Sequence, residues 1–417
     1  MKFIEIVLYA SIYLGIVATI FYILSFLENM KIKKKLFRDD ELPVVSIMIP
    51  VHNEEKSIES TLKSILKSEY PEGKFEVVVV NDGSTDKTLE KIKKFEGKIN
   101  GKSVRIFSKK QGGKGSALNL ALKKVKGEIV FSMDADTLVE KQSVKNMIRY
   151  FKEEKVMCVS PAMSLYKPEN ALEKFQYIEY LTGLFLRKAF SFLNSINVTP
   201  GAFSAYRKSF FDKYGGYEEG NITEDLEVSL RIQYNNYIIE NCIEAPVYTT
   251  APKTFMHLLK QRRRWYVGLM RNSWEYRKMF SPKYGDMGLF VMPTAFLSIV
   301  FCIIVTIYLF FKTLFDVKDE ILFFNSINFD FPSTLNLNIY FFEKWFLLFV
   351  TNPVVIFIGF FMIIILFSLY YASRKLGKLP GAFLGFFLFF IFFSVLFGIW
   401  WIVSIFYIIF KKTVIWK

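Results

Sequence analysis

Four long stretches without a charged residue constrain this chain more than any other feature. They cover residues 6–27, 287–311, 345–373 and 379–410, and they are 22, 25, 29 and 32 residues long. A helix needs about 20 apolar residues to cross the hydrocarbon core of a bilayer, so each stretch predicts a membrane-spanning helix. The first is too long for the apolar part of a signal peptide and no small-residue cleavage site follows it, so it predicts an uncleaved anchor.

The distribution of Lys and Arg indicates how these helices are oriented. Only Lys2 precedes the first stretch, whereas a basic cluster follows it, made of Lys31, Lys33, Lys34, Lys35 and Arg38. Cytoplasmic segments are enriched in Lys and Arg, so the chain after the first stretch is expected in the cytoplasm. The loop over residues 312–344 has a net charge of −2 and suits the outside. The tail, with Lys411, Lys412 and Lys417, would then lie outside against the same rule. Either the tail is too short to matter, or the last stretch does not cross simply.

A polar segment of ordinary domain size separates the first stretch from the second. It alternates β-rich runs with helical ones, which predicts an α/β domain with a mostly parallel sheet. The expected strands cover residues 44–50, 75–81, 103–107 and 128–133. The expected helices cover residues 54–68, 85–95 and 115–124. Overall composition excludes two other classes, because 52% hydrophobic residues rule out a disordered chain and three cysteines rule out a disulfide scaffold.

Polar residues follow three of the expected strands at the point where each strand ends. These clusters are residues 50–55, residues 81–86 and residues 134–136. Any one of them could consist only of turn and helix-capping residues. Ligands of open α/β sheets bind beyond the carboxyl ends of the strands, so three clusters in register predict a single cleft.

One of these clusters is suited to a metal ion, and a glycine-rich run just upstream of it is suited to a phosphate. Asp134 and Asp136 could hold a hard divalent cation through oxygen, with a diphosphate completing the coordination. The glycine-rich run over residues 111–116 opens a helix, and its Lys114 adds a cation for phosphate. The spacing of this run fits neither a P-loop nor a dinucleotide-binding fingerprint, which argues against an ATPase and a nicotinamide enzyme.

Two further motifs make the interpretation specific. Thr-Glu-Asp stands at residues 223–225 and Gln-Arg-Arg-Arg-Trp at residues 261–265, after Asp82 and Asp134-x-Asp136 and between the apolar stretches. In this order the motifs resemble the family 2 glycosyltransferases with the GT-A fold. Within that family they resemble the processive membrane synthases of cellulose, hyaluronan, chitin oligosaccharide and poly-N-acetylglucosamine. The resemblance covers roughly residues 44–280 and the flanking spans.

The resemblance implies an architecture for the whole chain. It implies an α/β GT-A domain, a Rossmann-like transferase of nucleotide-diphospho-sugars, in the cytoplasm, together with a helical transmembrane region. The expected parts are an N-terminal transmembrane helix (1–30), the catalytic domain (31–252), an amphipathic interfacial segment (253–286) and a C-terminal transmembrane region (287–417).

The resemblance also assigns roles to individual residues. Nucleotide-sugar binding is expected from Asp82, Lys114, Asp134, Gln261 and Arg264. Mg²⁺ or Mn²⁺ is expected at Asp134 and Asp136. Catalysis is expected from Asp225, as general base, and from Glu224. Acceptor binding is expected from Trp265, Gly201 and Ala202. Asn81 stands where many relatives have a second Asp, which alters the expected contacts to the nucleotide.

The chemistry of glycosyl transfer explains these choices. Negative charge develops on the departing nucleoside diphosphate, and a metal with Arg264 can stabilise it. The attacking hydroxyl must lose a proton, which Asp225 can accept from a distance of about 2.6–3.2 Å. One base and direct attack imply inversion at the anomeric carbon. The alternatives are a helix-capping role for Asp225 and an interfacial anchor for Trp265.

The formal charge of +15 comes largely from the segment beside the last motif. Residues 253–283 carry nine Lys and Arg and a single acidic residue, interleaved with apolar side chains. This pattern predicts an amphipathic helix on the membrane surface, and residues 171–192 predict a second one. Lipid headgroups and substrate phosphates therefore account for the charge, and no nucleic-acid partner is expected. The two histidines and three cysteines form no zinc or redox motif.

Two functions remain open on this basis. The first is elongation of a polysaccharide, with passage of the product into or across the membrane. The second is transfer of one sugar to a lipid acceptor, as in ceramide glucosyltransferases, which carry a similar final motif. A transporter or an inactive scaffold fits less well, because the motif residues are intact and the spans lack internal ionisable groups. Four spans are few for a polymer channel, so a small partner subunit or a second copy is also expected.

Overall fold

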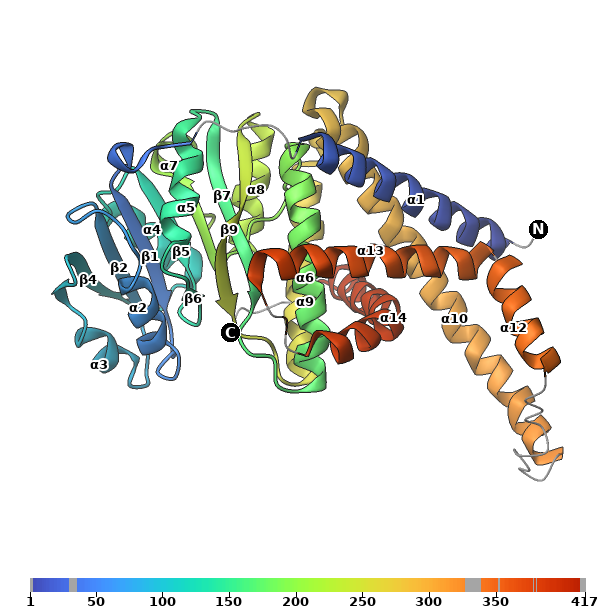
Figure 1. The fold of residues 1–417 in the computed structure, drawn as a ribbon. Coiled ribbons are helices and arrows are strands. Elements are labelled where there is room, and N and C mark those ends of the chain that lie inside the picture. Colours follow the sequence, from blue (N-terminus) through green and yellow to red (C-terminus); the bar gives the residue numbers. More distant parts are fainter. Residues whose placement is uncertain are drawn as a thin grey trace.

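The computed structural model describes residues 3–29, 36–326, 339–351, 353–377, 379 and 381–412. A single twisted sheet with its covering helices lies on one side, and long helices lie on the other (Figure 1). The basic cluster at Lys31, Lys33, Lys34 and Lys35 lies outside the described residues. The same holds for residues 327–338 of the expected external loop and for Lys417.

The sheet has nine strands in the order β3-β4-β2-β1-β5-β8-β7-β9-β6. Their bounds are β1 (Val45–Val51), β2 (Phe75–Asp82), β3 (Gly97–Ile99), β4 (Lys102–Lys109), β5 (Ile129–Met133), β6 (Leu138–Val139), β7 (Val156–Leu165), β8 (Phe203–Arg207) and β9 (Ile238–Thr249). The four predicted strands are β1, β2, β4 and β5, and they pair in parallel. Their carboxyl ends therefore lie at one edge, as the polar clusters required.

The prediction of a mostly parallel sheet is wrong for the other half of the sheet. β8 pairs antiparallel with both β5 and β7, β9 runs parallel to β7, and β6 runs antiparallel to β9. The edge strand β3 is also antiparallel to its neighbour β4. The sheet is therefore mixed. Because β8 enters beside β5 from the opposite direction, the residues that precede β8 meet those that follow β5.

Helices cover both faces of the sheet because the buried strand residues alternate between two cores. On one face, Ile47 and Ile49 of β1 pack with α2 (Ile58–Leu66) and α5 (Ser143–Arg149). On the other face, Met48 packs with α4 (Lys114–Lys124), α7 (Lys208–Tyr214) and α8 (Glu224–Tyr234). A short helix, α3 (Thr88–Lys93), follows β2. Strands buried on both faces are what a covered parallel sheet requires.

Two amphipathic helices lie between the sheet and the long apolar helices (Figure 1). They are α6 (Ala171–Phe192), whose bounds equal the predicted ones, and α9 (Phe255–Glu275). A shared core joins them to α13 (Pro353–Leu376) and α14 (Ala382–Ile409). α6 also packs on α1 (Phe3–Asn29) through Phe26 and Phe185. The two amphipathic helices therefore connect the sheet to the apolar helices.

In the described part of the chain, four helices are long and apolar enough to cross a membrane. They are Phe3–Asn29, Met287–Ser326, Phe357–Leu376 and Ala382–Ile409. The second consists of a π-helical turn, η5 (Met287–Val291), that continues into α10 (Met292–Ser326). The stretch over residues 345–373 is not one helix, because α12 (Ile339–Thr351) ends before Pro353, where α13 begins. A proline disfavours helical geometry at the preceding residue and is well tolerated at a helix start.

Candidate functional site

A cleft of about 740 Å³ lies at the carboxyl ends of β1, β2 and β5. Its lining contains residues from all three predicted polar clusters and from the glycine-rich run. The lining residues are Pro50, Val51, His52, Asn53, Glu54, Asp82, Gln111, Gly113, Lys114, Asp134, Ala135 and Asp136. The sequence therefore located this cleft correctly, and Asp82, Lys114, Asp134 and Asp136 all line it.

Asp82 organises the glycine-rich run that precedes α4. Its carboxylate accepts hydrogen bonds from Lys109 Nζ at 2.8 Å, from the Gly112 amide at 2.9 Å and from the Gly113 amide at 2.7 Å. Its backbone carbonyl accepts one from His52 Nδ1 at 2.8 Å. Because Gly113 has φ +87°, a conformation that side chains rarely adopt, this turn favours glycine. Asp82 thus fixes the shape of one wall of the cleft.

Lys114 connects the cleft to the Thr-Glu-Asp motif. Its ammonium lies 2.7 Å from Asp134 Oδ1 and 2.9 Å from Glu224 Oε1, and its side chain is 8% exposed. Burial alone would lower the pKa of Lys114, but the carboxylates of Asp134, Glu224 and Asp225 raise it above its usual value. Burial favours the neutral form of Glu224, yet the Lys114 charge lowers the pKa of this carboxyl. Lys114 is therefore a permanent cation between two carboxylates from distant parts of the chain.

Asp225 lies directly beside the segment that precedes β8. A Cβ atom on Gly201 would stand 2.5 Å from Asp225 Oδ2 and 3.1 Å from Lys114 Nζ, so only glycine allows this approach. The neighbouring Ala202 carbonyl accepts a hydrogen bond of 2.9 Å from the Asp134 amide. Burial and the adjacent Glu224 raise the pKa of Asp225 to about 6, against the opposing effect of Lys114 and Arg264. A carboxylate with such a pKa is suited to accept a proton near neutral pH.

The last motif lies on α9 and reaches the Thr-Glu-Asp motif through its arginine. Arg264 donates a hydrogen bond of 2.9 Å to the Ile222 carbonyl, one residue before Thr223. Gln261 has a buried Oε1 atom that accepts no hydrogen bond from any described residue. Trp265 is half-buried. None of these three side chains is among the described residues that line the cleft, and their expected contacts with donor and acceptor stay predictions.

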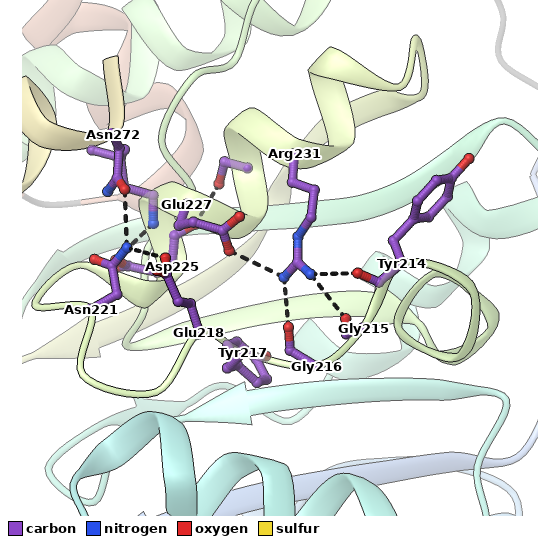
Figure 2. Close-up of polar contacts among 12 residues, drawn as sticks. Tyr214, Gly215, Gly216, Tyr217, Glu218, Asn221, Asp225, Glu227, Arg231 and Asn272 are labelled. Atoms are coloured by element: carbon purple, nitrogen blue, oxygen red, sulfur yellow. Dashed lines mark hydrogen bonds and ion pairs between the residues drawn. The ribbon is translucent and has the colours of Figure 1, made fainter. Parts of the chain in front are cut away.

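The loop between α7 and α8 is held by side chains that sequence reasoning missed (Figure 2). Arg231 of α8 donates hydrogen bonds to the carbonyls of Tyr214, Gly215 and Gly216 and pairs with Glu227.

At the other end of this loop, Asn221 donates to Asn272 Oδ1 at 3.0 Å (Figure 2), and Asn272 donates to Thr223 Oγ1 at 3.0 Å. Gly268 lets α9 approach Thr223 closely, because a Cβ there would clash with its side chain. The Thr-Glu-Asp motif is thus fixed against α9.

The donor groups around Asp134 and Asp136 fit a divalent cation. Burial, and repulsion between these two carboxylates, raise the pKa of Asp134; burial and the nearby Glu54 charge raise that of Asp136. A cation between them would relieve this repulsion. No group of three or more His, Cys, Asp and Glu side chains with metal-binding geometry occurs among the described residues. The protein alone therefore offers two carboxylates, and a ligand would have to supply further oxygens.

Glu54, which lines the cleft, and Thr250, which contacts Asp136, were not singled out from the sequence. Glu54 follows β1, and burial raises the pKa of its carboxyl while a hydrogen bond from Ser57 opposes the shift. Thr250 follows β9 and donates a hydrogen bond of 2.6 Å to Asp136 Oδ2. Glu54 lay within a polar cluster that the sequence indicated, whereas Thr250 follows a strand that the sequence did not indicate.

Comparison with known proteins agrees with the sequence motifs. Residues 46–215 match the family model of Glycosyl transferase family 2. The chain is 31% identical over 276 residues to poly-beta-1,6-N-acetyl-D-glucosamine synthase of Staphylococcus epidermidis, which is 64% of this chain and 65% of that protein. It is also 31% identical over 263 residues to the synthase of the same name from Staphylococcus aureus strain N315 (62% and 63%). The chain thus spans just under two thirds of the length of these relatives.

A solved structure shares the fold over nearly the whole chain. It is the mannosyltransferase PcManGT from Pyrobaculum calidifontis in complex with GDP-Man and Mn²⁺, with a TM-score of 0.59 and 18% sequence identity. The match covers 98% of this chain and 100% of that one. At this identity the likeness shows that the fold is shared.

Proposed function

We propose that the chain is a membrane-bound inverting glycosyltransferase that elongates a polysaccharide, because residues 46–215 match the family 2 model and the fold is that of a solved glycosyltransferase. The sugar would come from a nucleotide-sugar, and the acceptor would be a hydroxyl group at the end of the growing chain. The names of the relatives make UDP-N-acetylglucosamine the first donor to test.

One observation carries this proposal. Lys114 contacts Asp134 in the cleft and Glu224 next to Asp225, so a single buried cation joins the donor cleft to the proposed base. The segment before β8 contacts both of these regions as well. Gly201 lies against Asp225, and the Ala202 carbonyl accepts a hydrogen bond from the Asp134 amide. A donor in the cleft and an acceptor beside the segment before β8 would therefore meet at Asp225.

We propose the following roles in the donor site. Asp82 would bind the base of the nucleotide. Its carboxylate has about four acceptor sites, and the protein uses three of them, so about one can still accept a hydrogen bond from the base. Asp134 and Asp136 would hold Mg²⁺ or Mn²⁺. The cation would stabilise the charge that develops on the departing diphosphate. Lys114, Gln261 and Arg264 would bind the diphosphate. For Gln261, the buried carbonyl oxygen without a protein partner among the described residues supports a ligand contact.

Asp225 would accept the proton of the attacking hydroxyl, and Glu224 would keep Lys114 in place beside it. The raised pKa of Asp225 supports the first role, and the 2.9 Å ion pair supports the second. Trp265, Gly201 and Ala202 would bind the acceptor, with the indole offering a flat apolar face to a pyranose ring. Direct attack with a single base gives inversion at the anomeric carbon.

The membrane arrangement is also proposed. The parts would be the anchor over residues 1–30, the catalytic domain over residues 31–252 in the cytoplasm, the interfacial segment over residues 253–286 and the transmembrane region over residues 287–417. The four apolar helices support a location in the cell membrane, and the basic residues of α9 would contact lipid headgroups. A small partner subunit or a second copy of the chain stays a prediction.

The experiment that tests this function sizes the products. Purified protein in lipid is incubated with UDP-N-acetylglucosamine, other UDP-sugars and GDP-mannose, each with Mg²⁺ or Mn²⁺. Long products that form while most acceptors remain unreacted would support elongation. A single-sugar glycolipid, extractable into organic solvent, would instead establish the ceramide-glucosyltransferase-like alternative, which the relatives do not favour.

A further inference from the structure

Arg262, within the last motif, has a side chain that is only 2% exposed. Its Nη2 atom lies 2.7 Å from Glu179 Oε2 on α6, and the Glu179 side chain is 22% exposed. Its guanidinium carbon lies 4.2 Å from the ring centroid of Trp265 and 5.5 Å from that of Trp400 on α14. A single guanidinium is therefore held by a carboxylate from one helix and contacts the indoles of two others.

This arrangement restricts how the Trp265 indole can lie. A buried guanidinium that loses its carboxylate partner is strongly destabilised, so Glu179 keeps Arg262 in one position. The planar guanidinium of arginine stacks on an aromatic face, which the compact ammonium of lysine cannot reproduce. Arg262 lies over the indole of Trp265, whose side chain is half-buried, and so limits the orientations that the ring can take.

Two further contacts between α9 and α14 can be compared with the contact of Arg262. Tyr266 stacks on Trp401 with ring centroids 4.5 Å apart and an interplanar angle of 11°. Arg263 lies over Tyr407 with its guanidinium carbon 4.2 Å from the ring centroid. Arg263 thus makes the same kind of contact as Arg262, at the same distance, with an aromatic ring of α14 instead of Trp265.

We propose that Arg262, anchored by Glu179, is a positioning residue that fixes the indole of Trp265 for stacking on the acceptor sugar. This inference rests on the proposed role of Trp265 in acceptor binding. Arg262 is not among the described residues that line the cleft. Its effect is confined to the affinity for the acceptor, and the chemical step at Asp225 is independent of it.

The test compares Arg262→Lys and Glu179→Gln with the matched control Arg263→Lys. The substrates are UDP-N-acetylglucosamine and a short fluorescent N-acetylglucosamine oligomer, and KM is measured for each. Arg262→Lys is expected to raise the acceptor KM about five- to thirty-fold, with kcat and the donor KM nearly unchanged. Glu179→Gln is expected to raise it in the same direction. Arg263→Lys is expected to leave it unchanged, because Arg263 lies over Tyr407 and not over Trp265.

A second variant shows whether Arg262 acts through Trp265. In a Trp265→Ala background, Arg262→Lys should have no additional effect on the acceptor KM, because the partner of the stack is already gone. An unchanged acceptor KM in Arg262→Lys, or an equal rise in Arg263→Lys, would overturn the proposal. Additive effects of the two changes would overturn it as well.

A measurement that does not require sugar transfer distinguishes failure of this proposal from failure of the proposed function. If the wild-type protein transfers no sugar, the function fails, but the geometry can still be tested with 5-fluorotryptophan and fluorine NMR. The Trp265 resonance, assigned with Trp265→Phe, is expected to shift in Arg262→Lys and to stay in place in Arg263→Lys. A Trp265 resonance that is identical in the wild type and in Arg262→Lys would overturn the inference.

Discussion

The raised pKa of Asp225 predicts an acidic limb in the pH–rate profile at an unusual position. Burial and the neighbouring Glu224 carboxylate raise this pKa to about 6, from an ordinary value of 3.8. The base acts only when it is deprotonated, so activity is retained above this pKa and lost as the pH falls through it. With a pKa of about 6, the deprotonated fraction falls about tenfold from pH 7 to pH 5. With an ordinary carboxyl it would fall by only about 6% over the same range.

The assay measures kcat/KM for the acceptor at saturating donor and metal, because this ratio reports the pKa of the form that has not yet bound acceptor. Asp225→Asn should lose about 10²–10⁴-fold in rate and lose the limb, while donor binding stays nearly intact. Asp134 and Asp136 also have raised pKa values, so the profile is repeated at higher metal concentration. If the loss of activity at low pH came from protonation of the metal ligands, more metal would shift it to lower pH. If it came from protonation of Asp225, it would stay at the same pH. A profile that is flat down to pH 5 would refute this reasoning.

The remaining predictions concern the metal, the acceptor segment, the tryptophan and the tail. Excess EDTA should abolish turnover, and Asp136→Ala should weaken metal-dependent UDP binding measured by calorimetry; full activity in EDTA would contradict the metal site. Gly201→Ala should abolish transfer, since its methyl group would lie 2.5 Å from the proposed base, whereas Gly359→Ala, with open space around it, should be neutral in the same rate assay. Trp265→Ala should shorten the products seen on a sizing gel, and Trp274→Ala, on the same helix but 73% exposed, should not. A reporter fused to the C-terminus should be active in the cytoplasm, and activity only outside would oppose the topology argued below.

The sequence predicted the position of the cleft well because its signals are local. Each polar cluster follows a strand whose apolar residues are contiguous, and parallel neighbours bring their carboxyl ends to one edge. The bounds of α6 could also be predicted, because its amphipathic pattern continues over residues 171–192 and Asn170 with Glu173 forms a capping box at its start.

The acceptor side could not be predicted in the same way. β8 pairs with β5 from about 70 residues further along the chain, and nothing in the local pattern indicates that its direction is reversed. The contact of Lys114 with Glu224 joins residues from separate helices, and the bond from Asn272 to Thr223 depends on how α9 packs. These contacts follow from tertiary packing, so the motifs indicated which residues matter without indicating how they are joined.

The position of the last apolar helix, α14, bears on the charge conflict that the sequence left open. At the start of α14, Gly381 packs on Lys174 of α6, where a Cβ would lie 3.1 Å from Lys174 Cε. At its other end, Tyr407 lies under Arg263 of α9. Both ends of α14 therefore contact α6 or α9, the two amphipathic helices that lie on the side of the sheet (Figure 1).

A helix whose two ends lie on one side of a bilayer does not cross it, so we propose that three of the four candidate helices cross, namely α1, η5 with α10, and α13. Lys411 and Lys412 would then lie on the side of the catalytic domain, which the bias of Lys and Arg favours. α14 packs along α6, α9 and α10 on one side only, and Phe383, Ile391 and Ile409 on its other side are exposed. Its buried Trp400 and Trp401 contact α9, the helix that carries Trp265.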